Sequence, residues 1–95
     1  MVYTVDAVRD RVVPALKRHG VVRAALFGSI VRGEAHSGSD VDFLVEFEGG
    51  KSLFDLVHLQ DELEEILGQP ADVVTYSSLH RRIRDRVLRE QDPLL

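Results

Sequence analysis

The sequence predicts an α/β (α+β) fold in which helices cover a small mixed β-sheet. Residues 21–27 and 71–75 are rich in β-branched and apolar side chains, and residues 40–48 alternate between apolar and polar, as strands do. The remaining segments place apolar side chains at helical spacing. The expected order is helix, strand, short helix, strand, helix, strand, helix. One domain over residues 1–95 is expected, because a chain of 95 residues can bury a single modest core.

The first helix is expected over residues 5–19. Thr4 can cap its N-terminus and Gly20 can end it. Pro14 argues against this helix, because a proline inside a helix removes a backbone hydrogen bond and tends to kink the axis. Apolar residues nevertheless recur at helical spacing, at Val5, Val8, Val12 and Leu16. A short second helix is expected over residues 29–34.

The third helix is expected to begin near Ser52 and to end at Gly68, since Pro70 prevents its continuation. Its apolar stripe is predicted to consist of Leu53, Leu56, Val57, Leu63, Ile66 and Leu67. The last helix is expected over residues 78–91. The apolar side of this last helix is predicted to be Leu79, Ile83 and Val87.

The composition is typical of a globular protein that folds in water, with 44% hydrophobic and 29% charged residues. The apolar runs are far shorter than the roughly 20 residues of a membrane helix, and the N-terminus does not resemble a signal peptide. There is no cysteine, hence no disulfide framework. We therefore expect a cytoplasmic protein with no membrane partner. The net charge of −4 argues against direct binding of nucleic acid.

The charge is distributed unevenly along the chain. Acidic residues gather between Glu34 and Glu65, and arginines gather near the C-terminus. These arginines are Arg81, Arg82, Arg84, Arg86 and Arg89. They form either a solvated helix face or a contact surface for a partner chain or a triphosphate.

Two aspartates at the start of the second strand are candidate metal ligands. Because strand side chains alternate, Asp40 and Asp42 project from one face, and Val41 and Phe43 from the other. Two like charges at close range repel, and a divalent cation between them would relieve the repulsion. Carboxylate oxygens on a strand suit Mg²⁺. The alternative interpretation is the polar outer face of an edge strand.

The residues just before these aspartates are candidates for phosphate binding. Gly28 and Ser29 end the first strand and open a short helix, where free backbone N–H groups can bind an anion. Glycine permits close backbone approach, the Ser29 hydroxyl can donate to a phosphate oxygen, and Arg32 can add charge. Alternatively, Gly28 and Ser29 form an ordinary turn and Arg32 is a surface residue.

Together, residues 28–45 resemble the active-site signature of the polymerase-β-like nucleotidyltransferases. More narrowly, they resemble the minimal nucleotidyltransferases, the short partners of HEPN-type proteins in bacterial and archaeal two-gene modules. The pattern Gly-Ser-x-x-Arg-Gly, a short loop and Ser-Asp-x-Asp is matched at every diagnostic position. The resemblance extends over most of the chain, from the first helix to the third strand.

The resemblance implies which residues would perform catalysis, hold the metal ions and bind the nucleotide. Asp40, Asp42 and Asp72 would be the catalytic residues and would hold two Mg²⁺ ions, with Asp72 also helping to deprotonate the attacking hydroxyl. From the residues alone, Asp72 could equally be a solvent-facing acid at a strand start. The nucleotide-binding residues implied are Gly28, Ser29, Arg32 and Ser39.

The function that the resemblance implies is that of an antitoxin. Such a protein adenylyltransferase would transfer AMP from ATP to a tyrosine hydroxyl of a HEPN-type toxin and thereby silence it. Two alternatives remain open: neutralisation by complex formation without transfer of the bound nucleotide, and nucleotidyl transfer to an antibiotic or a metabolite. Its apolar helix faces would also allow the chain to form a homo-oligomer.

Overall fold

A computed structural model describes residues 3–36, 38–49 and 53–95 of the chain. The elements in order are α1 (Val5–Arg18), β1 (Val21–Phe27), α2 (Ser29–Arg32), β2 (Val41–Phe47), α3 (Leu53–Leu67), β3 (Ala71–Thr75), the 3-10 helix η1 (Tyr76–Ser78), α4 (Arg81–Glu90) and β4 (Asp92–Pro93). The strands form one sheet in the order β3-β2-β1-β4. Strand β1 runs antiparallel to β2 and β4, and β2 runs parallel to β3. The predicted mixed sheet is therefore confirmed.

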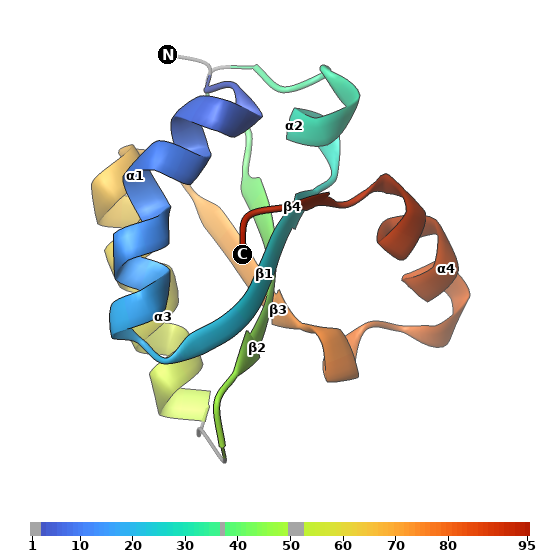
Figure 1. The fold of residues 1–95 in the computed structure, drawn as a ribbon. Helices are drawn as coiled ribbons and strands as arrows, with labels where there is room; N and C mark the ends of the chain where they lie inside the picture. Colours follow the sequence, from blue (N-terminus) through green and yellow to red (C-terminus); the bar gives the residue numbers. More distant parts are fainter. Residues whose placement is uncertain (1–2, 37, 50–52) are drawn as a thin grey trace.

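Helices α1 and α3 lie together against one face of the sheet, and α4 lies on the other side (Figure 1). On the α1/α3 face, alternate residues of β2 enter the main core, as their apolar-polar alternation predicted. These residues are Val41, Phe43 and Val45, which are fully or almost fully buried. Leu16 of α1 and Leu63 of α3 are completely buried in the same core. The main hydrophobic core therefore lies between the sheet and these two helices.

The face that carries α4 has a much smaller apolar cluster. Leu44 of β2 is fully buried there, together with Ala25 of β1 and Val87 of α4. Because side chains alternate along a strand, Asp42 shares this face with Leu44, two residues further along β2. Asp72 of β3 occupies the same face by the same alternation. The candidate acids thus lie on the less densely packed side of the sheet.

Helix α1 begins as predicted and ends one residue early. The Thr4 hydroxyl accepts a hydrogen bond from the Ala7 N–H (3.1 Å), which caps the first turn. The helix continues through Pro14 to Arg18. Pro14 is exposed, so water can satisfy the backbone carbonyl that has lost its intrahelical partner.

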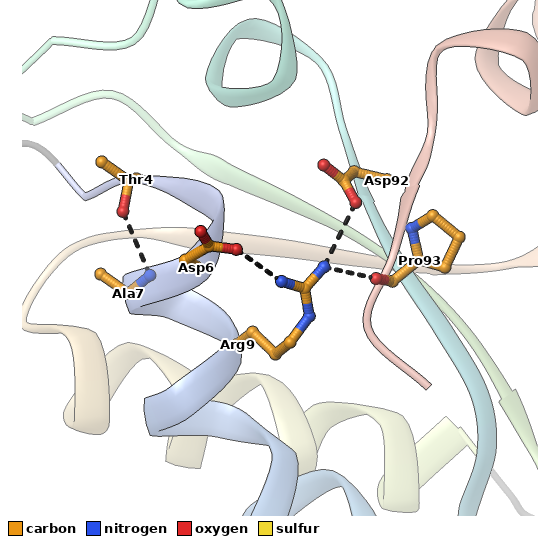
Figure 2. Close-up of polar contacts among 6 residues, drawn as sticks. All are labelled: Thr4, Asp6, Ala7, Arg9, Asp92 and Pro93. Atoms are coloured by element: carbon orange, nitrogen blue, oxygen red, sulfur yellow. Dashed lines mark hydrogen bonds and ion pairs between the residues drawn. The ribbon is translucent and has the colours of Figure 1, made fainter.

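A short C-terminal strand, β4, pairs with β1 and was not expected from the sequence. Two residues give no periodicity to read, and Pro93 is tolerated because β4 is an edge strand. Figure 2 shows the hydrogen bonds by which Arg9 of α1 holds β4 in place. The Arg9 guanidinium donates to Asp6 (2.7 Å), to Asp92 (3.2 Å) and to the Pro93 carbonyl (2.8 Å).

The apolar stripe predicted for α3 is partly wrong. Leu59, which the prediction omitted, is fully buried, whereas Leu53 is 72% and Val57 is 48% exposed. Val57 precedes Leu59 by two residues, about 200° around a helix, so it faces away from the sheet. The predicted start signal at Ser52 lies outside the described residues, and the end at Gly68 is confirmed by its positive φ of 68°.

The last helix is shorter than predicted. Residues 76–78 form η1, and α4 begins at Arg81, where the His80 imidazole accepts from the Arg82 N–H (3.1 Å) and caps the helix. Val87 is buried as expected, but Ile83 is 44% exposed because α4 meets the sheet over a narrow strip. Within the described ranges, no helix has the length and apolar character needed to cross a membrane.

Candidate active site

The register of the sheet brings two of the predicted acids side by side. Asp42 is the parallel partner of Asp72 on β3 and the antiparallel partner of Phe27 on β1. Neighbouring strands lie about 4.8 Å apart, so the side chains of Asp42 and Asp72 leave one face of the sheet as direct neighbours. Asp40 precedes β2 by one residue and is exposed. The three acids therefore belong to one end of the sheet.

Gly28 allows the chain to pass directly against Asp42. Its φ of 80° and ψ of −151° belong to a region that essentially only glycine adopts. A Cβ atom at this position would collide with Oδ2 of Asp42. The sequence predicted close backbone approach here, and the structure shows that the Asp42 carboxylate is the group approached. Ser29 follows as the first residue of α2 and is partly buried.

The electrostatic environment of Asp42 is unfavourable for its charge. Its pKa is raised from 3.8 to about 6, first because burial disfavours the carboxylate and then because Asp72 and Asp40 repel it. The charge of Arg32 acts in the opposite direction. Asp42 is therefore the centre of the acidic group, with both other acids and Arg32 acting on it.

Arg32 lies at the end of α2 between two carboxylates. Its Nε atom pairs with Glu34 Oε1 (2.8 Å), and its Nη1 atom pairs with Glu90 Oε2 on α4 (3.2 Å). A hydrogen bond to Glu34 is the largest of the effects that raise the Arg32 pKa. The guanidinium is thus close enough to act on Asp42 but is itself held by carboxylates.

The loop before β2 is fixed partly by Ser39. Its hydroxyl accepts a hydrogen bond from the His36 N–H (2.9 Å), and its carbonyl accepts one from Gln69 Nε2 (3.1 Å). The second bond joins the loops that lead into β2 and β3, on which Asp42 and Asp72 lie. Ser39 therefore shapes the loop that carries Asp40, and its predicted contact with nucleotide stays a prediction.

Comparison with known proteins identifies the family. The profile of the nucleotidyltransferase domain matches residues 9–91. This chain belongs to the nucleotidyltransferase domain family. A "putative protein adenylyltransferase" of Methanocaldococcus jannaschii is 50% identical over 86 residues, which are 90% of this chain and 92% of that protein. The protein adenylyltransferase MntA of Thermococcus cleftensis is 49% identical over 74 residues, 78% of this chain and 75% of that one.

Solved structures agree on the fold of this nucleotidyltransferase. A "putative minimal nucleotidyltransferase" has a TM-score of 0.81 at 45% identity, covering 93% of this chain and 90% of that one. A toxin-antitoxin structure with AMP-PNP has a TM-score of 0.80 at 21% identity, covering 92% of this chain and 72% of that one. At 21% identity, the similarity to the second structure shows only that the fold is shared.

The acids of this nucleotidyltransferase fit a divalent cation in their donor chemistry. Carboxylate oxygens are the ligands that Mg²⁺ prefers, and the mutual repulsion that raises the pKa of Asp42 is what a bound cation would relieve. In the described part of the chain, however, no three His, Asp or Glu side chains are arranged to hold a metal ion. Because Asp40 and Asp72 are exposed, their side chains can rotate toward a cation at little cost.

Sequence reasoning missed one residue of this region. Glu90 comes from the C-terminal end of α4 and reaches Arg32 across 58 positions of sequence. No motif surrounds it, and a glutamate among arginines is typical of an exposed helix. Only the packing of α4 against the sheet reveals its position.

Proposed function

We propose that this nucleotidyltransferase transfers AMP from ATP to a tyrosine hydroxyl of a HEPN-type toxin and so acts as its antitoxin. The observation that carries the proposal is the register that sets Asp42 beside Asp72 and against Gly28, within a signature matched at each diagnostic position. Support for a protein acceptor comes from the names of two relatives, a "putative protein adenylyltransferase" at 50% identity and a protein adenylyltransferase at 49% identity.

ATP and the HEPN toxin are the most specific parts of the proposal. One protein of the same fold, at 21% identity, was solved in a toxin-antitoxin structure with AMP-PNP. Another, at 17% identity, is an MNT antitoxin from a complex with a tri-AMPylated HEPN toxin of Shewanella oneidensis. Likeness at these identities is one of fold, so nucleotide and acceptor require direct tests for this chain.

In the proposed reaction, the acceptor oxygen forms a bond to the α-phosphorus of ATP. The bond from that phosphorus to the bridging oxygen breaks, and pyrophosphate leaves. Asp40 and Asp42 would hold Mg²⁺ with Asp72, and the cation, when bound, would stabilise the negative charge on the phosphates. Asp72, which lies on the side of Asp42 away from β1, would accept the proton of the attacking hydroxyl.

The other side of Asp42 is formed by the end of β1 and the start of α2, and the triphosphate would lie there. The absence of a side chain at Gly28 keeps the approach to Asp42 open. The Ser29 hydroxyl would donate to a phosphate oxygen, and the Arg32 guanidinium would offset its charge. The two sides of Asp42 thus receive the donor and the acceptor separately.

The test is transfer of labelled AMP. We would incubate the protein with α-labelled ATP, magnesium and the product of the adjacent gene, the expected HEPN-type acceptor, and follow label on that product. We expect label with the wild type and none with the Asp40→Ala, Asp42→Ala double variant. The matched control, Asp61→Ala, removes an exposed acid of α3 and should transfer normally. Stable binding of the two proteins without any label would contradict the proposed transfer.

A further inference from the structure

A pocket of about 190 Å³ lies between α4 and the junction of β1 with α2, next to the candidate site. One wall is apolar, formed by Phe27, Ile83 and Val87, and the charged lining consists of Arg32, Arg86 and Glu90. Gly28, which touches the Asp42 carboxylate, also lines the pocket. A larger cavity of about 370 Å³ is lined by Phe47 and Tyr76, at the opposite end of β2 from Asp42. Of these two pockets, the smaller one adjoins the Asp42 carboxylate, through Gly28.

Glu90 holds one guanidinium with each carboxylate oxygen. Its Oε2 atom lies 3.2 Å from Arg32 Nη1, and its Oε1 atom lies 3.5 Å from Arg86 Nε. The Glu90 side chain is only 28% exposed, whereas that of Arg86 is 63% exposed. One anionic group is therefore already bound between two arginines at the wall of this pocket. A phosphate presents oxygens to arginines in the same manner as a carboxylate.

We propose that Arg86 and Glu90 of α4 form the outer half of the triphosphate site. Glu90 occupies the position of an outer phosphate while the site is empty of nucleotide. The triphosphate displaces Glu90 from Arg32 and Arg86, and both arginines then bind its β- and γ-phosphates. This inference rests on the proposed function, because it assigns residues to the nucleotide of that reaction.

The exchange is favourable on charge grounds. Partly exposed ion pairs such as Arg86 with Glu90 contribute little free energy, so Glu90 is displaced at low cost. The triphosphate carries more negative charge than one carboxylate and offers several acceptor oxygens to each guanidinium. Glu90 is therefore a competitor of the nucleotide, and Arg86 is a binding residue in addition to Arg32.

Equilibrium binding of a non-hydrolysable ATP analogue, with magnesium present, tests this by calorimetry on the full chain. We expect Arg86→Gln to raise Kd about tenfold, which is about 1.4 kcal/mol. We expect Glu90→Gln to lower Kd about threefold, because a competing carboxylate is removed. The matched controls are Arg89→Gln and Asp85→Asn, which change the charge of the same helix outside the pocket lining and should leave Kd within about twofold.

A second ligand separates the outer phosphates from the rest of the nucleotide. AMP lacks the β- and γ-phosphates, so Arg86→Gln should leave its Kd within about twofold of the wild-type value. An equal loss for AMP and for the triphosphate would overturn the assignment to the outer phosphates, and so would unchanged triphosphate binding by both pocket variants. If the wild type bound neither ligand, the proposed function and this inference would fail together. Misfolding cannot explain opposite effects of the two variants, and thermal unfolding of each provides the direct check.

Discussion

The two faces of the sheet differ in how densely they are packed and in what they carry. The face under α1 and α3 contains a continuous apolar core that includes Val12, Phe43 and Leu63, all fully buried. The face under α4 has a cluster of Ala25, Leu44 and Val87 and, at one end, the acids. In a chain of 95 residues, a single face can supply most of the stabilising burial.

This difference explains how the protein accommodates repelling charges. Asp42 and Asp72 are neighbours in register, which disfavours ionisation of Asp42. Among the described residues, by contrast, the opposite face of the same strands buries no polar residue. Every second residue of β2 contributes to the core, so the alternate positions are free to carry function. Substitutions of the acids on the α4 face should therefore change activity, and substitutions on the α1/α3 face should change stability.

The largest expected effect is on activity, at the α4 face. Asp42→Asn should lower AMP transfer by about 10³-fold or more, close to 4 kcal/mol, because the neutral amide is a poor metal ligand. Folded stability should not fall, since burial and Asp72 already disfavour the Asp42 charge. Initial transfer rates and thermal unfolding of the same samples measure both. The control is Asp61→Asn on α3, which should transfer AMP normally. If Asp42→Asn lost stability as well as activity, the separation of the two faces would be contradicted.

The next effect is on stability, at the opposite face. Leu63→Ala should lower the free energy of unfolding by about 3 kcal/mol, because a fully buried side chain leaves a cavity. Val87→Ala on the α4 face should cost only about 1 kcal/mol, since its cluster is small and open. Urea unfolding gives both values. Equal losses would show that the two faces contribute alike.

A backbone substitution tests the contact between Gly28 and Asp42. Gly28→Ala should destabilise the fold by about 2 kcal/mol and also impair transfer, because its dihedral angles suit only glycine and its Cβ meets the carboxylate. Gly68→Ala is the matched control: it lies outside the signature and also has positive φ, but open space surrounds its Cβ. We expect the control to cost about 1 kcal/mol and to transfer normally. Comparable losses of transfer in both variants would reject the contact as the cause.

The smallest effect is a pH dependence of stability. The folded-state pKa of Asp42, about 6, lies above its ordinary value of 3.8, so the folded protein binds this proton more tightly than the unfolded chain. The contribution of Asp42 to stability is therefore complete below pH 3.8 and is lost as pH rises through about 6. For this half-exposed group we expect about 1 kcal/mol. Unfolding of the wild type minus that of Asp42→Asn, followed from pH 4 to 7, isolates it, and a rise with pH would contradict the assignment.

Much of the fold could be predicted because local patterns determine it. The alternation of β2 predicted its buried residues, and Thr4 and Gly68 predicted where helices begin and end. The periodicity of α3 wrongly predicted that Val57 faces the sheet. Val57 is exposed, whereas Leu59, on another side of the helix, is fully buried. Propensity does not fix the rotation of a helix about its axis.

The site could be predicted in part for a similar reason. Asp40 and Asp42 are recognisable together because they flank Val41, the first residue of β2. That Asp72 is the register partner of Asp42 follows from the parallel pairing of β2 with β3, which the sequence reveals only by resemblance. The sequence singles out Arg86 only within a run of five arginines that could contact a partner chain or a triphosphate. Glu90 could not be found, since its contact with Arg32 depends on long-range packing of α4.

The pairing of β4 with β1 also determines when the site is complete. Asp92 and Pro93 pair with Leu26 and Ala25, which precede them by most of the chain length, and Arg9 fastens them to α1. Contacts of such separation are late to form, since a long loop must close before they contribute. On a ribosome, α1, α3 and strands β1 to β3 can therefore assemble first, while β4, α4 and the pocket beside α4 wait for residues that are synthesised later. The protein would acquire its fold before it acquires its affinity for nucleotide.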